Sequence, residues 1–295
     1  MSDLKSVPPH HTHAIMLAIA ANFGWAVMSI TIKWLTLRGY PTLEITFFNG
    51  LVSFCCLAGW ISLRGEWLRL KTSNPVVMGT YVLFSVGAGL CFFRAFGTGK
   101  LADVNIVFAS GPFMVALLSS LFLKEHLSRS QLLTILTGFL GIMLVMRPQP
   151  DMSMYMPLLI IFVGTLLLSV SQILVRKCRG SISSFVFTFY FCTGFIIVSG
   201  LLMTYVPVRG ADVPVFLLSG LCDVICLNLL YTSFRYASVS VLAPFQYSQI
   251  LWCGVMGYLI WHEMPDIWSA LGGVIVICSG IAFTRNILGD KNVTA

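Results

Sequence analysis

The chain has 295 residues, of which 57% are hydrophobic and only 10% are charged, whereas soluble domains carry about 25% charged residues. A soluble fold of this length has too little interior to bury so much apolar surface, so the composition excludes a soluble protein and indicates a lipid bilayer as solvent. The net charge of +7 does not indicate nucleic-acid binding, because the basic residues are scattered singly between apolar runs.

The first apolar run follows a polar segment that ends at His13 and extends over 14–32. It is longer than the core of a secretory signal, and Ala18-Ile19-Ala20 lies near its start, where a signal peptidase would not cut. We therefore interpret it as a retained membrane span. The histidines at 10, 11 and 13 are interpreted as part of a solvated tail and not as metal ligands.

Nine further apolar runs follow in chain order. They cover 45–63, 72–93, 104–123, 130–146, 152–175, 180–208, 213–234, 236–261 and 267–284, and Asp223 interrupts one of them. Most approach the roughly 20 residues that a helical span requires. None shows the short alternating pattern of a β-barrel strand. The sequence thus predicts an all-α membrane protein with ten transmembrane helices.

The positive charges predict the orientation of these helices. With the N-terminus in the cytoplasm, twelve Lys and Arg residues fall on the inside and six on the outside. The positive-inside rule then favours a cytoplasmic position for both termini. We expect an integral protein of the bacterial cytoplasmic (inner) membrane.

An internal repeat relates the two halves of the chain. A shift of 138 residues brings Glu125 onto Glu263 and places the third to fifth runs on the eighth to tenth. A shift of 143 brings Asn22, Ala26, Ser29 and Lys33 onto Thr165, Ser169, Gln172 and Arg176, and the steps of four, three and four place each set on one helical face. Five spans is an odd number, so the second half must enter the membrane upside down.

The repeat predicts the organisation of the chain as two inverted five-helix repeats. We expect a cytoplasmic tail at 1–13, a first repeat at 14–148, a second repeat at 152–286 and a cytoplasmic tail at 287–295. Inverted repeats recur in secondary transporters, where the substrate site lies near the midplane between the halves. A gene duplication without any role in transport is the alternative.

Asp223 is the most informative single residue. It lies ten residues into its run, about 15 Å deep at 1.5 Å per helical residue, and it is the only acid inside a predicted span. An acid at this depth costs about 2.5–3.5 kcal/mol on insertion scales, so it usually faces a cavity or a polar partner. Asp223 is therefore a candidate site for a proton or a substrate, and a tie between helices is the alternative.

Other polar and aromatic side chains within the runs are candidates for substrate binding. Arg94 can bind an anionic group or extend to the lipid headgroups. The polar faces of the first and sixth spans can bind a solute or join helices. Pro244 predicts a kink beside the glutamines of the ninth run. The candidate substrate-binding residues are Asn22, Trp25, Ser29, Arg94, Ser169, Gln172, Asp223, Tyr231, Gln246, Tyr247 and Gln249. Glu125 and Glu263 are interpreted as caps or loop ties.

The nine cysteines form no CxxC pattern, and Cys222 and Cys226, one turn apart, have no further ligand types beside them. We predict no metal site, no cofactor and no catalytic residue. No Walker or Rossmann glycine pattern is present, which argues against ATP-driven pumping.

Two stretches resemble a known family. One is an apolar span that ends in Glu, in Phe122-Leu123-Lys124-Glu125 and again in Leu259-Ile260-Trp261-His262-Glu263. The other is the stretch from Tyr236 to Gln249 around Pro244. Over roughly 14–286 the chain resembles the drug/metabolite transporter superfamily in its ten-helix EamA-type form. The resemblance implies a secondary carrier or exchanger with a central cavity lined mainly by the first, third, fourth, sixth, eighth and ninth spans.

These observations predict a secondary transporter that moves a small polar organic metabolite, with protons as a candidate coupling ion. Amino acids, nucleoside-like compounds such as S-adenosylmethionine and flavin-like compounds are candidate substrates, for import or for export. The alternative is a membrane-embedded enzyme that acts on lipid. Such enzymes gather His and acidic residues near one interface, whereas His126 and His262 are predicted on opposite sides.

Overall fold

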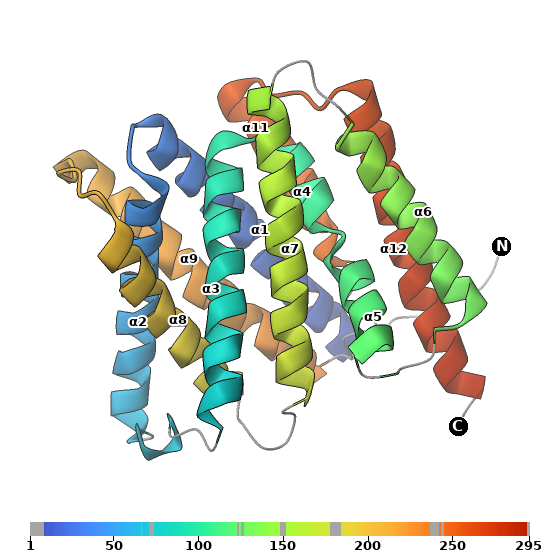
Figure 1. Ribbon diagram of the computed structural model, residues 1–295, viewed down its shortest axis with the longest axis horizontal. Helices are drawn as coiled ribbons and strands as arrows, with labels where there is room; N and C mark the ends of the chain where they lie inside the picture. Colours follow the sequence, from blue (N-terminus) through green and yellow to red (C-terminus); the bar gives the residue numbers. More distant parts are fainter. Residues whose placement is uncertain are drawn as a thin grey trace.

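A computed structural model describes residues 9–65, 67–70, 74–122, 124, 127–147, 152–177, 184–236, 242 and 245–293, and the regular structure of these residues is helical (Figure 1). The α-helices are α1 (Pro9–Leu37), α2 (Thr42–Arg64), α3 (Pro75–Thr98), α4 (Leu101–Phe108), α5 (Gly111–Phe122), α6 (Arg129–Val145), α7 (Met152–Lys177), α8 (Ser184–Leu202), α9 (Val213–Tyr236), α11 (Ser248–Trp261) and α12 (Ile267–Val293). Two short 3-10 helices, Trp67–Leu70 and Gly210–Asp212, lie in the connections.

The prediction of an all-helical membrane protein is confirmed. Seven described segments are long and apolar enough to cross a bilayer, and three shorter apolar helices complete ten span positions. The seven are Thr12–Leu37, Thr42–Arg64, Pro75–Thr98, Leu101–Phe122, Tyr155–Val175, Gly210–Leu230 and Ile267–Asn286, and the shorter ones are Arg129–Val145, Val186–Leu202 and Ser248–Trp261. Their outer faces carry exposed leucines such as Leu83, Leu140 and Leu201, as expected of helices that contact lipid tails.

Local sequence signals account for several helix ends. The side chain of Asn74 caps α3 by accepting a hydrogen bond from the Val77 amide, and Pro75 occupies the first turn, where no amide donor is needed. Ser128 and Gln131 form a reciprocal capping box at the start of α6. α2 ends at Gly65, whose φ of 66° lies in the left-handed region that glycine adopts without steric cost.

The two halves of the helical bundle are arranged as inverted counterparts. We call the end where α1 meets α2, α3 meets α4 and α11 meets α12 the upper end, as in Figure 1. At this end α1, α3, α6 and α8 finish, whereas their counterparts α7, α9, α12 and α2 begin. The ninth span finishes here with α11, whereas the fourth span begins here with α4. The contacts between helices follow the same correspondence. α1 packs along α9, and their counterparts α7 and α3 pack along each other. α2 contacts α9, and their counterparts α8 and α3 are also in contact. α6 and α12, the last helices of the two halves, pack on each other.

The structure differs from the predicted spans at several places. The fourth span is divided into α4 and α5 by a turn at Ala109–Ser110, and the ninth run is not uninterrupted, because a turn at Tyr247 precedes α11. α1 already begins at Pro9 and α12 continues to Val293, so the described parts of both predicted tails are helical. Helices extend past their apolar segments because backbone hydrogen bonding also stabilises turns that project into water.

Candidate functional site

The two turns that interrupt the fourth and ninth spans occupy corresponding positions in the two halves. Ala109 and Ser110 become Tyr247 and Ser248 after the 138-residue shift that relates the halves. At the first turn, Gly111 and Pro112 follow directly, and Pro112 has no amide hydrogen to donate to the carbonyl of Phe108. Discontinuous helices in matching positions mark the substrate and ion sites of inverted-repeat transporters.

The polar faces of α1 and α7 face these interrupted spans. Ser29 of α1 and Asn105 of α4 are both in hydrogen-bond contact with the thiol of Cys253 in α11. On the other side, Thr165 of α7 lies against Gly111, since a Cβ added at Gly111 would stand 3.6 Å from the Thr165 methyl group. The polar face of α7 thus meets the interruption of the fourth span, and the polar face of α1 meets α11, which follows the interruption of the ninth span.

Most of the predicted polar stripe is buried and bonded within its own helix. Asn22, Ser29, Thr165 and Ser169 are all buried. Asn22 Nδ2 donates to the Ala18 carbonyl, and the three hydroxyls donate to carbonyls four residues earlier, at 2.7 to 2.9 Å. Because these groups act as donors in the bonds above, their oxygen atoms can still accept hydrogen bonds from a solute at the centre of the bundle. Gln172 is exposed and does not extend the buried stripe.

Two donors that the sequence analysis missed lie just after the second interruption. Ser248 Oγ and Trp252 Nε1 are buried and have no hydrogen-bond partner among the described residues. They are four residues apart and therefore share one face of α11. The Trp252 ring packs edge-on against Phe23 of α1, with centroids 5.3 Å apart. No spacing signal distinguished these residues from ordinary packing residues of an apolar helix.

The remaining candidates of the ninth run lie beside this interruption. Tyr247 and Gln249 are buried and Gln246 is partly buried. The Tyr247 ring lies against α12 at Gly280, where an added Cβ would stand 1.9 Å from the hydroxyl oxygen, so the glycine provides the space for this ring. Pro244, Glu125 and the side chain of Tyr231 lie outside the described residues.

Asp223 lies in the middle of α9 and contacts two neighbouring helices. Its Oδ2 accepts a hydrogen bond from Ser53 Oγ of α2 at 3.3 Å, and the Trp25 side chain of α1 forms another hydrogen bond with the carboxyl group. One turn nearer the upper end, Asn49 Nδ2 of α2 donates to Ser219 Oγ at 2.9 Å. Asp223 therefore joins three helices. Its role toward a proton or a substrate stays a prediction.

Asp223 is not the only acid within a membrane helix, contrary to the sequence analysis. Glu44 is fully buried near the start of α2, where its Oε2 accepts a hydrogen bond from the Val206 amide at 3.3 Å. Asp103 lies in the first turn of α4. Both acids precede the apolar runs of the sequence, and they enter the spans because the helices begin earlier than the runs.

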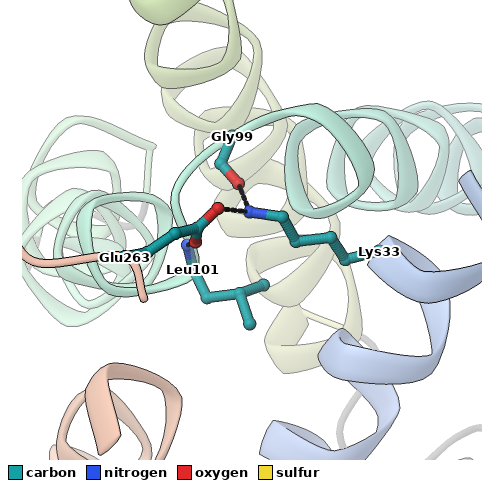
Figure 2. A network of polar contacts seen from close by, with 4 residues as sticks. All are labelled: Lys33, Gly99, Leu101 and Glu263. Atoms are coloured by element: carbon teal, nitrogen blue, oxygen red, sulfur yellow. Dashed lines mark hydrogen bonds and ion pairs between the residues drawn. The ribbon is translucent and has the colours of Figure 1, made fainter. Parts of the chain in front are cut away.

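The upper end holds a buried ion pair between the two halves (Figure 2). Lys33 Nζ of α1 pairs with Glu263 Oε1, which follows α11, and also donates to the Gly99 carbonyl at 2.7 Å. The second carboxylate oxygen of Glu263 accepts the Leu101 amide of α4 at 3.4 Å. Glu263 thus caps α4, in agreement with its interpretation as a loop tie, whereas its pairing with Lys33 was not foreseen.

The turn that supplies the Gly99 carbonyl requires glycine. A Cβ at Gly99 would stand 2.5 Å from a methyl group of Val104 and 2.9 Å from Cβ of Pro157 in α7. The absence of a side chain lets the α3–α4 turn approach α7 closely enough for its carbonyl to reach Lys33.

Two further ion pairs lie at the upper end, and each has at least one side chain that is more exposed than those of the Lys33–Glu263 pair. Arg38 pairs with Asp212 at 3.2 Å, and Asp212 also accepts the Tyr40 hydroxyl at 3.0 Å. Arg147, after α6, pairs with Asp266. Partial burial acts to raise the pKa of Asp266, but the hydrogen bond from the backbone of Ser269 and the charge of Arg147 outweigh it, so its pKa lies below the usual range.

A cavity of about 530 Å³ lies beside the Lys33–Glu263 pair. Its walls come from the end of α3, the α3–α4 turn, the start of α7 and the α11–α12 connection, and its lining is Arg94, Thr98, Gly99, Lys100, Asp103, Met156, Pro157, Leu158, Ile160, Glu263 and Asp266. The volume is typical of small-molecule sites. Arg94 is the one residue among the sequence-predicted candidates that lines it, and Asp223 and the polar stripe do not.

The described geometry defines the class of protein as a polytopic helical membrane protein with inverted halves, matched helix interruptions and polar faces at its centre. Residues 12–147 match the EamA-like transporter family. The first half of the chain thus matches the model of the EamA-like transporter family, and the relatives described below are similar to the chain over nearly its full length.

Relatives match over nearly the whole chain and are named as transporters. The pseudopaline exporter of Pseudomonas aeruginosa is 24% identical over 93% of this chain and 97% of its own length. The S-adenosylmethionine uptake transporter of Rickettsia bellii is 21% identical over 89% of each chain, and the riboflavin transporter of Rhizobium johnstonii is 19% identical over 97% and 95%. One solved crystal structure superposes with a TM-score of 0.65 at 16% identity over 95% of this chain and 98% of that chain, which indicates a shared fold.

The comparisons favour transport over the alternative of an enzyme acting on lipid. The relatives named above are transporters from bacteria, and this chain is an integral membrane protein that is similar to them over nearly its whole length.

Proposed function

We propose that this protein is a secondary carrier or exchanger that moves a small polar organic metabolite across the bacterial cytoplasmic membrane. The observation that carries the proposal is the pair of matched interruptions, at Ala109–Ser110 and at Tyr247. Thr165 of α7 lies against the residue that follows the first interruption, and Ser29 of α1 contacts the helix that follows the second. At the second interruption Ser248 Oγ and Trp252 Nε1 have no partner among the described residues, and a solute or water can satisfy such donors within a membrane protein.

The central site lies between α1, α4, α5, α7 and α11. The unpaired donors Ser248 Oγ and Trp252 Nε1 offer hydrogen bonds to a polar solute, and the rings of Trp252 and Phe23 offer an apolar surface beside them. The relatives named for S-adenosylmethionine, riboflavin and pseudopaline support a polar organic substrate of metabolite size.

Asp223 is the proposed coupling residue. Its carboxyl group contacts α1 through Trp25 and α2 through Ser53, so protonation changes a contact between helices of opposite halves. A proton that binds in one orientation and leaves in the other would couple transport to a proton gradient.

Transport by reconstituted protein tests the proposal. Purified protein in liposomes is supplied with labelled S-adenosylmethionine, riboflavin or an amino-acid mixture, with an imposed gradient of protons or of unlabelled compound inside. We expect saturable flux of one class, and lower flux from Ser248→Ala and Trp252→Phe. Absence of flux for every class and every gradient would contradict a carrier function.

The coupling role is tested with Asp223→Asn, which keeps the size and the hydrogen-bonding capacity of the side chain but does not titrate. We expect proton-driven flux to fall sharply, because an ionisable residue inside a membrane span usually marks a functional site, while exchange of substrate for substrate persists. Ile225→Ala, an exposed position on the same helix, is the matched control. Unchanged flux and unchanged pH dependence in Asp223→Asn would leave Asp223 as a structural tie only.

A further inference from the structure

A carboxyl group that the proposed transport function does not use lies fully buried at the start of α2. The Glu44 side chain has no exposed surface. Its Oε2 accepts a hydrogen bond from the Val206 amide at 3.3 Å, whereas its Oε1 has no hydrogen-bond partner among the described residues. Thr42 Oγ1, two residues earlier, is also buried without a partner in that part of the chain, so it does not donate to this carboxyl group.

The position of Glu44 in its helix does not supply the missing donor. Pro41 is the N-cap of α2, which makes Glu44 the third helical residue. A carboxyl group at this position often closes a capping box by accepting the N-cap amide, but proline has no amide hydrogen to donate. The helix N-terminus favours a negative charge, yet this effect is smaller than the desolvation cost of a buried, unpaired carboxylate.

Charged groups of the neighbouring elements do not compensate an ionised Glu44. The elements that pack on α2 are α1, α3, α8 and α9, and no ion pair of the described residues includes Glu44. α8 contains no charged residue, and Tyr205 and Arg209 of the α8–α9 connection are exposed. The charged groups at the upper ends of the other elements are Lys33, paired with Glu263, Arg38, paired with Asp212, and Arg94, which lines the cavity.

Asp223, the proposed coupling residue, is a separate group. It accepts its hydrogen bond from Ser53, which lies nine residues after Glu44 in α2. At about 1.5 Å per helical residue, the two carboxyl groups therefore lie at levels roughly 13 Å apart along α2.

The α8–α9 connection is the segment that bonds to Glu44. Residues 203–209 form no helix, and the amides of Val206 and Arg209 bond instead to Glu44 and to the Tyr40 hydroxyl at the α1–α2 corner. Val206 and Val208 pack partly buried against the core. A segment held in this way can separate from α2 without the loss of a helical turn.

From this arrangement we infer that Glu44 is a second proton site. In the described conformation its carboxyl group is neutral, with the proton on Oε1, and the α8–α9 connection separates it from water at the upper end. When the connection moves away from α2, the O–H bond breaks, the proton passes to water and the carboxylate becomes solvated. A proton must bind again before the connection can return, because an unpaired carboxylate is too costly to bury. As a step of a carrier, this role rests on the proposed function.

Infrared spectroscopy of the purified protein in lipid nanodiscs tests the protonation state, since a neutral carboxylic acid has a C=O stretching band that an ionised carboxylate lacks. We expect Glu44→Gln to remove one such band at neutral pH, both alone and in combination with Asp223→Asn. Asp266→Asn is the matched control and should leave these bands unchanged, because Asp266 is paired with Arg147 and its pKa lies below the usual range. Unchanged bands in Glu44→Gln would overturn the inference.

Thermal unfolding gives a second measurement of the same charge. Glutamine resembles the neutral acid, so Glu44→Gln should melt at the same temperature as the unmodified protein at low pH. As the pH rises, the unmodified protein should become less stable than the variant, because its unfolded state ionises and its folded state does not. A lower melting temperature of Glu44→Gln at neutral pH would indicate an ionised carboxylate that caps α2 and would overturn the inference.

Hydrogen–deuterium exchange of residues 203–209 tests the movement of the connection. Because intrinsic exchange depends on pH, the unmodified protein and Glu44→Gln are compared at each pH. We expect equal exchange at low pH and faster exchange in the unmodified protein at high pH. Equal exchange at every pH would overturn the link between the proton and the connection. Exchange that depends on sodium, in a comparison of sodium with choline salts, would assign the site to a metal cation and overturn the proton site.

This site and the carrier function can fail separately. Flux in liposomes, without a carboxylic acid band that depends on Glu44, would retain the carrier and refute the proton site. A band that depends on Glu44, without flux of any compound, would retain the proton site and refute the carrier function.

Discussion

The Lys33–Glu263 pair allows a quantitative test of the structure, because its two side chains are buried to different extents. The side chain of Lys33 is 6% exposed and that of Glu263 is 21% exposed. Glu263→Gln removes the negative charge, so the Lys33 charge is enclosed with neutral acceptors only, the amide oxygen of the glutamine and the Gly99 carbonyl. Lys33→Met leaves Glu263 with the Leu101 amide and partial access to water.

Removal of one partner from a buried ion pair costs about 3–5 kcal/mol. The loss for Glu263→Gln should lie near the lower limit, since the Trp261 ring, 5.2 Å from Lys33 Nζ, retains a cation–π contact worth about 0.5–2 kcal/mol. The loss for Lys33→Met should be about 1–3 kcal/mol, the usual cost of a partly satisfied group. The double variant should lose less stability than the sum of the two single losses, because it contains neither charge and so leaves no charge unpaired.

Unfolding in mixed detergent micelles, followed by circular dichroism, measures these free energies for the two single variants and the double variant. Arg147→Met and Asp266→Asn are the matched controls, since the side chains of that pair are 33% and 37% exposed and should contribute less than about 1 kcal/mol. Strict additivity of the Lys33 and Glu263 losses, or a larger loss for Lys33→Met than for Glu263→Gln, would refute the described network.

Three further predictions concern packing, pH and topology. Gly272→Ala should lower the melting temperature, because the added Cβ would stand 2.5 Å from a backbone oxygen of α6. The control Gly79→Ala, where the added Cβ has no atom within 4 Å, should be neutral or slightly stabilising. Equal effects of the two variants would contradict the α6–α12 contact. Because the pKa of Asp266 is lowered on folding, its contribution to stability should be complete above the ordinary value of 3.8 and disappear as the pH falls through the lower folded value. The stabilities of Asp266→Asn and of the unmodified protein, measured by acid titration, should therefore converge at low pH. Reporter fusions near Arg209 and at the C-terminus should report opposite sides of the membrane, and same-side reports would contradict the predicted orientation.

Much of the fold follows from local composition. Most apolar runs approached the length of a span, and a bilayer leaves a continuous apolar segment little alternative to a helix. The 138-residue and 143-residue offsets predicted inverted halves, because five spans reverse the direction of entry into the membrane. The polar faces of α1 and α7 were also predicted from spacing alone, since residues three and four apart share a helical face.

The number of spans and the polar faces of α1 and α7 could thus be predicted from residue order alone. Which of these polar groups meet depends on the packing of the helices. Lys33 pairs with Glu263 across 230 residues, and Ser53 contacts Asp223 across 170. Likewise, the unpaired donors Ser248 Oγ and Trp252 Nε1 and the turn at Tyr247 depend on how neighbouring helices cross and rotate. Between helices in a bilayer, lipid tails compete equally for every apolar face, so close packing and a few polar contacts select the partners, and no single helix carries that information.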